Sequence, residues 1–130
     1  ARGLPAALAS LAARATPSVE LSVDLPRRPA EAIEVAAYYV VSEALANTTK
    51  HARASIAHVE LRADDGRLQI SVSDDGIGGA SSDDGSGLVG LTDRVEALGG
   101  TILVESPQGQ GTRLEVDLPI DLDDGPRRPN

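Results

Sequence analysis

The sequence predicts an α/β (α+β) fold in a single domain, because helical and strand-like segments alternate along the 130 residues. Apolar residues recur at three- and four-residue steps in some segments and at every second residue in others. A chain of this length buries roughly two thirds of the surface that its unfolded form exposes, which is enough for one core. We expect the domain to span residues 1–120 and the acidic, then Pro/Arg-rich residues 121–130 to form a disordered tail.

The first half of the chain predicts two helices and a strand. Residues 3–14 are rich in Ala and Leu and predict a helix, and alternation over residues 19–25 predicts a half-buried strand. Residues 31–52 predict a long amphipathic helix, and Pro29 is well placed just before its start.

The second half predicts a hairpin, a shorter helix and a final pair of strands. A turn over residues 64–66 is expected to join the hairpin strands, and Gly99-Gly100 to end the helix. In chain order, these elements are residues 56–61, 68–72, 87–98, 101–105 and 112–118.

Composition and charge exclude several classes of protein. A net charge of −8 without a basic stripe argues against a nucleic-acid binder. The absence of cysteine excludes disulfides and thiolate metal sites, and it fits a reducing compartment. Charged residues interrupt every long apolar run, so we expect no membrane span, no secretory signal and no membrane contact by this segment.

Three polar residues of the long predicted helix form the first candidate site. Glu43, Asn47 and Lys50 lie within about 60° of one another, on one edge of the apolar stripe. A carboxamide oxygen is a hard ligand for Mg²⁺, an ammonium group pairs with phosphate, and a carboxylate can accept a proton. The set suits a Mg²⁺-nucleotide, and an ordinary solvated Glu/Lys edge is the alternative. His51 projects from the apolar stripe, which favours a core or interface histidine over a catalytic one.

Asp74 is the second candidate, because it follows a strand-like segment and precedes Gly76 and Gly78. Glycines allow the backbone to approach a flat ring closely. An ionised carboxylate only accepts hydrogen bonds, so it can select an exocyclic amine such as adenine N6 over the carbonyl of guanine. The alternative is a glycine-rich hairpin loop in which Asp serves the turn.

Gly85, Gly87 and Gly90 have the spacing of the dinucleotide-binding fingerprint but not its context. That fingerprint requires a strand that runs directly into the glycines, whereas the preceding predicted strand ends near Ser73. A lid that leads into the 87–98 helix fits better, because free N–H groups at a helix N-terminus can hold phosphate oxygens. The Walker A sequence Gly-Lys-Ser/Thr is absent.

In this order and spacing, residues 43–51, 74–79 and 85–90 resemble the N, G1 and G2 boxes of the gyrase and histidine-kinase ATPase superfamily. Residues 3–119 resemble the catalytic ATP-binding domain of a two-component sensor histidine kinase. The Glu-Ala-x-x-Asn-x-x-Lys-His-Ala and Gly-x-Gly-Leu-x-Gly-Leu-x-x-Arg-Val patterns resemble the subfamily that pairs with helix-turn-helix response regulators. The missing F box agrees with the short-lid members of this subfamily, and Asp75 stands where Asn is common, a mild departure.

The resemblance implies a two-layer α/β sandwich, with a mixed β-sheet covered on one face by helices and an ATP lid between the G1 and G2 boxes. It implies ATP and Mg²⁺ as cofactors, with Asn47 as metal ligand, Lys50 at the phosphates and Asp74 at adenine N6. Glu43 would be catalytic and would polarise the acceptor histidine. The other implied nucleotide contacts are Gly76 and Gly78 at the adenine pocket, Gly85, Gly87, Leu88 and Gly90 at the lid, and Thr112 near the adenine edge through water.

The resemblance also implies an activity and its partners. The domain would bind ATP or ADP and donate the γ-phosphoryl group of ATP to a histidine on the dimerisation and phosphoacceptor domain of the same parent, and so act indirectly on a response regulator. Neither His51 nor His58 lies in the context of that acceptor. We expect this domain to be cytoplasmic, either in a soluble parent protein or as the cytoplasmic part of a membrane-bound sensor kinase. The alternatives are a serine kinase of the anti-sigma-factor type on the same fold and a non-catalytic interaction module that binds no nucleotide.

Overall fold

The computed structural model describes residues 3–14, 18–26, 28–47, 56–76, 88–105 and 111–120. Within these ranges the elements are α1 Gly3–Arg14, β1 Ser18–Asp24, α2 Glu31–Asn47, β2 Ile56–Asp64, β3 Arg67–Asp74, α3 Leu88–Ala97, β4 Thr101–Glu105 and β5 Arg113–Pro119. Every predicted element is confirmed, with ends that differ by up to three residues. The predicted continuation of the long helix to residue 52 and the tail 121–130 lie outside the described residues.

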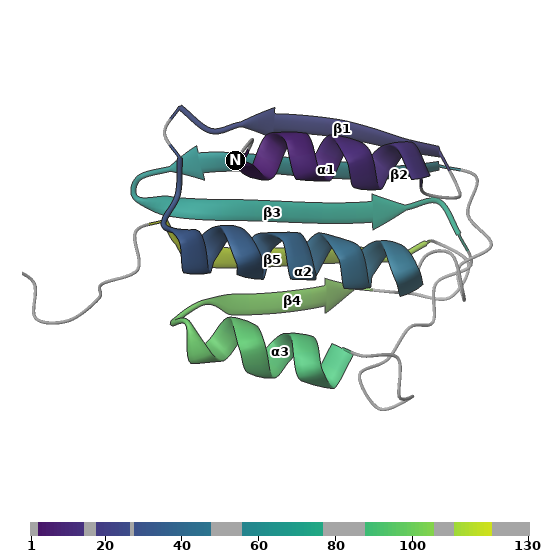
Figure 1. The fold of residues 1–130 in the computed structure, drawn as a ribbon. Helices are drawn as coiled ribbons and strands as arrows, with labels where there is room; N and C mark the ends of the chain where they lie inside the picture. The colour runs from purple at the N-terminus through teal and green to yellow at the C-terminus, as the bar shows by residue number, and fades with distance from the viewer. Residues whose placement is uncertain are drawn as a thin grey trace, which may run out of the picture.

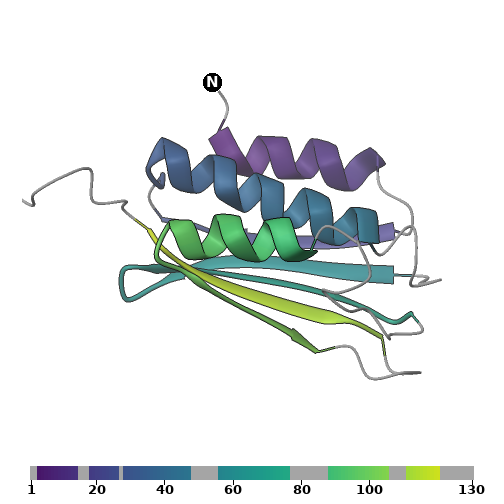
Figure 2. The same cartoon turned by 90° about the horizontal axis from the view of Figure 1, so that it is seen from below.

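The strands form one mixed sheet in the order β1-β2-β3-β5-β4. β1 pairs with β2 in parallel, and the other neighbouring strands are antiparallel. The helices α1, α2 and α3 all cover the same face of the sheet, as Figures 1 and 2 show from two directions. The two-layer sandwich with a mixed sheet covered on one face is therefore confirmed.

The core between the two layers is almost entirely aliphatic. Alternate residues of the three central strands are buried, as the period of a strand facing a helix layer requires. They are Ala57, Val59 and Leu61 of β2, Leu68, Ile70 and Val72 of β3, and Leu114, Val116 and Leu118 of β5. Tyr38 and Tyr39, the only aromatic residues of the chain, pack half-buried against this core from α2. None of the described helices combines the length and the apolar character needed to cross a bilayer.

The β2–β3 hairpin turns more tightly than the sequence pattern suggests. Asp65 and Gly66 have φ angles of 56° and 77°, and a two-residue turn with positive φ at both positions matches the twist of antiparallel strands. The strands therefore continue to Asp64 and from Arg67, and the predicted three-residue turn is one residue too long.

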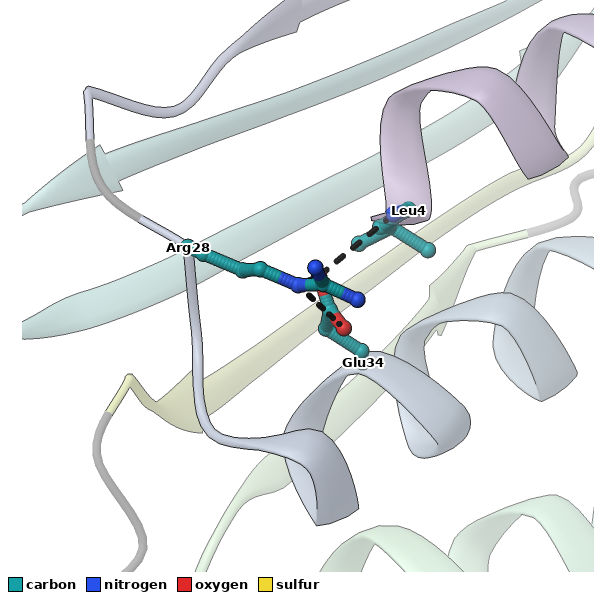
Figure 3. A network of polar contacts seen from close by, with 3 residues as sticks. All are labelled: Leu4, Arg28 and Glu34. Carbon is teal, nitrogen blue, oxygen red and sulfur yellow. Dashed lines mark hydrogen bonds and ion pairs between the residues drawn. The ribbon is translucent and has the colours of Figure 1, made fainter. Parts of the chain in front are cut away.

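Glu34 joins α1 to the start of α2 (Figure 3). Its buried carboxylate accepts a hydrogen bond from the Leu4 N–H at 3.4 Å and from the Arg28 Nε–H at 3.1 Å. The N-terminus of a helix carries a partial positive charge, so a carboxylate is favourable at the first turn of α1. This network ties α1, the segment before α2 and α2 together.

The functional segments predicted from the sequence meet at one end of the sandwich. The C-terminal ends of α2 and β3 and the N-terminal ends of α3 and β5 all lie on the right in Figure 1. The Glu34 network and the β2–β3 turn lie at the opposite end. This arrangement separates the candidate site from the polar network that fastens α1.

Candidate nucleotide-binding site

Asp74, the last residue of β3, is the best-defined part of the candidate site. Its Oδ1 accepts hydrogen bonds from the backbone N–H groups of Gly76 at 2.8 Å and Thr112 at 3.3 Å. The Asp74 N–H donates in turn to the Thr112 carbonyl at 2.9 Å. Backbone donors next to the ends of β3 and β5 orient a carboxylate more firmly than mobile side chains do. The G1-box residues Asp74 and Gly76 and the distant Thr112 thus form one hydrogen-bonded unit.

Gly111 lies against the backbone of Asp74; the Gly109-Gln110-Gly111-Thr112 stretch was noted before the last strand, but Gly111 itself was not predicted as a site residue. Gly111 is buried and has a φ of +79°, a conformation that residues with a Cβ rarely adopt. A Cβ added at Gly111 would overlap the backbone oxygen of Asp74. The available signal was the Gly109-x-Gly111-Thr112 pattern, which does not reveal which glycine makes the close approach.

Asp75 fastens the neighbouring strand to the same place. Its Oδ1 accepts a hydrogen bond from the Ile56 N–H at 3.1 Å, and its own N–H donates to the Ile56 carbonyl at 3.3 Å. β2, which follows the N-box segment in the chain, is thereby tied to the G1 box at its first residue. A carboxamide oxygen could accept the same bond, which explains why Asp is compatible here with a family pattern in which Asn is common.

The N-box helix brings Glu43 to this end of the molecule. Glu43 is half-buried and lies one helical turn before Asn47, the last described residue of α2. The neighbouring Ala44 and Leu45 are buried in the core, which holds this turn of α2 on the sheet. The backbone of α2 thus places Glu43 and Asn47 one helical turn apart.

α3 is held against α2 through Tyr39. The guanidinium carbon of Arg94 lies 4.6 Å from the centre of the Tyr39 ring, and a Cβ at Gly90 would stand 3.6 Å from the Tyr39 hydroxyl oxygen. Leu91 and Val95 anchor the opposite side of α3 in the core. The first turn of α3, which carries the last glycine of the G2 box, is therefore packed on the helix that carries the N box.

The remaining predicted residues are described only in part. The side chains of Asn47 and Leu88 lie outside the described part of the structure, as do all atoms of Lys50, Gly78, Gly85, Gly87 and His51. The predicted lid between the G1 and G2 boxes lies outside it as well. His58 is exposed on the open face of the sheet, where its Nδ1 lies 3.1 Å from a carboxylate oxygen of Glu20.

Comparison with known proteins identifies the family. The family described as "Histidine kinase-, DNA gyrase B-, and HSP90-like ATPase" matches residues 32–122. The chain is 34% identical over 93 residues to the signal transduction histidine-protein kinase/phosphatase DegS of Brevibacillus brevis, a match that covers 69% of this chain and 24% of DegS. It is 37% identical over 92 residues to the oxygen sensor histidine kinase NreB of Staphylococcus carnosus, covering 68% of this chain and 26% of NreB. The chain thus spans about a quarter of the length of these relatives.

This chain is also similar in structure to a solved histidine kinase. The Erythrobacter litoralis EL346 blue-light activated histidine kinase superposes with a TM-score of 0.70 at 26% identity, over 91% of this chain and 42% of that one. The resemblance to the ATP-binding domain of sensor histidine kinases is thereby confirmed. Because the family match spans most of the chain and includes all three boxes, the chain belongs to the histidine kinase-, DNA gyrase B- and HSP90-like ATPase family.

Proposed function

We propose that this domain binds ATP with Mg²⁺ and donates the γ-phosphoryl group to a histidine on the dimerisation and phosphoacceptor domain of its parent, in two-component signalling. The observation that carries the proposal is the Asp74 carboxylate, oriented by the Gly76 and Thr112 N–H groups at the end of the sandwich where α2 ends and α3 begins. The names of the relatives, which describe histidine kinases, support the same function.

Asp74 selects the base in this proposal. A carboxylate oxygen accepts a hydrogen bond from the exocyclic amine of adenine, whereas guanine and hypoxanthine present a carbonyl oxygen there. A carboxylate left facing a carbonyl loses its partner, which costs about 1–3 kcal/mol. Thr112 completes the adenine edge through water, and Gly76 with Gly78 leaves room for the ring.

The phosphates are held by α2, α3 and the lid. Lys50 supplies positive charge, and the N–H groups in the first turn of α3 supply donors for phosphate oxygens. Gly85, Gly87 and Gly90 allow the lid to close on them. The described residues contain no cluster of three or more His, Asp or Glu that could hold a metal ion by themselves. In this proposal the nucleotide carries the Mg²⁺, with Asn47 as the protein ligand of the metal and water and phosphate oxygens as its other ligands.

Glu43 acts on the acceptor. In the transfer, a nitrogen of the acceptor imidazole forms a bond to the γ-phosphorus, the bond to the β–γ bridging oxygen breaks, and ADP leaves. Glu43 accepts the proton of the other imidazole nitrogen in a hydrogen bond and raises the nucleophilicity of the ring. Phosphoryl transfer depends mainly on positioning and charge, so the isolated domain, with its acceptor on another segment, is expected to transfer little by itself.

The partners follow from this role. The acceptor histidine belongs to the parent protein, and a response regulator of the helix-turn-helix type receives the phosphoryl group afterwards. We place the reaction on the cytoplasmic side, where ATP is available.

The test is incubation with γ-labelled ATP, with and without a separately prepared dimerisation domain. We expect label on the added domain that survives alkali and is lost in acid, as phosphohistidine requires, and none on the isolated chain. Acid-stable label on a partner would favour the serine kinase, and failure to bind nucleotide would favour the interaction module. Alkali-stable label on the isolated chain that disappears in His51→Ala or His58→Ala would contradict the claim that the acceptor lies elsewhere.

A further inference from the structure

We propose that Gly111 is a positioning residue for nucleotide selection: it sets the orientation of the Asp74 carboxylate and thereby the preference for adenine. The inference rests on the proposed function, since it concerns the group that reads the base. Gly111 contacts Asp74 and is not itself assigned any contact with the nucleotide.

Two features of the backbone at Gly111 exclude a side chain there: its positive φ and the atoms that occupy the position of a Cβ. Its φ of +79° is in the left-handed region, and the space a Cβ would need is occupied by the backbone oxygen of Asp74, with the Asp74 carbonyl carbon 3.1 Å and the Asp75 Cα 3.4 Å away. These are backbone atoms, so they cannot move aside as the tip of a flexible side chain can. A side chain at position 111 must therefore push the entry to β5 away from the end of β3.

That displacement acts directly on the Asp74 side chain. Thr112 follows Gly111, and its N–H donates to Asp74 Oδ1 at 3.3 Å. A shift of β5 by a few tenths of an ångström takes this bond beyond useful hydrogen-bond distance. The Gly76 N–H, at 2.8 Å, then holds Oδ1 without the support of the Thr112 N–H on the same oxygen. The Asp74 carboxylate is then less firmly oriented, and its discrimination between an amine and a carbonyl falls.

Other glycines of the chain provide matched controls. Gly66 and Gly99 have φ angles of +77° and +82°, and a Cβ at either would meet nothing within 4 Å. Gly100 has the complementary property, since a Cβ there would overlap the backbone oxygen of Asp117. All three lie at the end of the sandwich away from Asp74. Their alanine variants thus reproduce the φ strain or the backbone overlap of Gly111→Ala without touching the proposed site.

The experiment is calorimetric titration of each variant with Mg²⁺-ATP and Mg²⁺-ITP, after far-UV circular dichroism has shown the fold to be intact. ITP carries a carbonyl where ATP carries the amine. We expect the native protein to prefer ATP on the order of 10- to 100-fold. Gly111→Ala is expected to weaken ATP binding about tenfold and to reduce the preference to about twofold, whereas Gly66→Ala, Gly99→Ala and Gly100→Ala keep the native preference.

A native preference retained in a folded Gly111→Ala overturns the inference and leaves the proposed function intact. A native protein that binds no ATP overturns both. Gly111→Asn is tested in parallel, because Asn tolerates positive φ and yet carries the same Cβ.

If neither Gly111 variant folds, the inference is tested by hydrogen exchange of the Thr112 amide in the native protein and in Asp74→Ala. The Thr112 amide should be protected in the native protein and should exchange at least about tenfold faster in Asp74→Ala, because the carboxylate is its acceptor. Equal exchange rates would mean that position 111 does not act through this bond, and would overturn the inference.

Discussion

The guanidinium carbon of Arg94 lies 4.6 Å from the centre of the Tyr39 ring, and this stacking joins α3 to α2 across the outer side of the helix layer. An arginine over a tyrosine face gains electrostatic energy from the ring quadrupole while its stem covers apolar surface. The pair matters beyond stability, because α2 carries Glu43 and Asn47 and the first turn of α3 faces the proposed phosphate site. The residues of α2 and the first turn of α3 can bind the same nucleotide only if the distance between the two helices is kept.

The Arg94–Tyr39 pair is expected to show a coupling energy of about 0.5–1 kcal/mol in a double-mutant cycle of Tyr39→Leu with Arg94→Ala. The free energy of unfolding is measured by urea denaturation for the native protein, both single variants and the double variant. Tyr39→Leu with Arg62→Ala is the control cycle, since Arg62 lies on the open face of the sheet and hydrogen-bonds Gln69. Equal coupling in the two cycles would show that the stacking contributes nothing specific.

Asp75→Ala is expected to lower the free energy of unfolding by about 0.5–1.5 kcal/mol, because the Ile56 N–H loses its side-chain acceptor. Asp75→Asn should cost less, since its carboxamide oxygen accepts the same bond. Urea denaturation of the two variants checks this order. An Asn variant as unstable as the Ala variant would mean that the negative charge, rather than the acceptor oxygen, matters at this position.

Glu34→Ala removes the acceptor shared by the Leu4 N–H and Arg28, so we expect about 1–3 kcal/mol of stability to be lost. ATP affinity should be unchanged, because the network lies at the end of the sandwich opposite to Asp74. Glu60→Ala, on the exposed face of β2, serves as control and should stay within about 0.5 kcal/mol of the native protein. A Glu34 variant with native stability would show that α1 is held by its apolar contacts alone.

Substitutions of Asn47 and Glu43 are expected to have different effects, the first on Mg²⁺-ATP affinity and the second on the rate of phosphoryl transfer. Asn47→Ala should weaken Mg²⁺-ATP about tenfold or more, equivalent to ~1.4 kcal/mol, and the difference from the native protein should vanish when EDTA removes Mg²⁺. Glu43→Gln should bind nucleotide normally yet transfer phosphoryl to an added acceptor domain on the order of 10²- to 10⁴-fold more slowly. A native transfer rate in Glu43→Gln would remove Glu43 from the catalytic role.

The sequence predicted the elements better than their arrangement. Alternation of apolar residues located β2 and β3, and their short connection predicted that they pair. Nothing in the alternation of β5 shows that it inserts between β3 and β4, because strand order is determined by long-range packing that a local pattern does not contain. The Arg94–Tyr39 contact escaped prediction for the same reason.

The candidate site was predicted as separate pieces. Asp74 was identified from its motif and Thr112 from the family resemblance, but neither indicates that the two are hydrogen-bonded to each other or that Gly111 lies against Asp74. Glycine adopts positive and negative φ with similar ease, so its presence does not reveal which conformation it has or what it approaches. Only the fold shows that the backbone of one motif takes the space beside another.

The central claim is that the Asp74 carboxylate selects adenine, and calorimetric titration with ATP and GTP in the presence of Mg²⁺ tests it most directly. The account predicts that ATP binds with a dissociation constant in the micromolar range or weaker, that GTP binds at least about tenfold less tightly, and that Asp74→Asn binds ATP much more weakly while remaining folded. GTP binding as tight as ATP binding in the native protein, or native ATP affinity in Asp74→Asn, would contradict it.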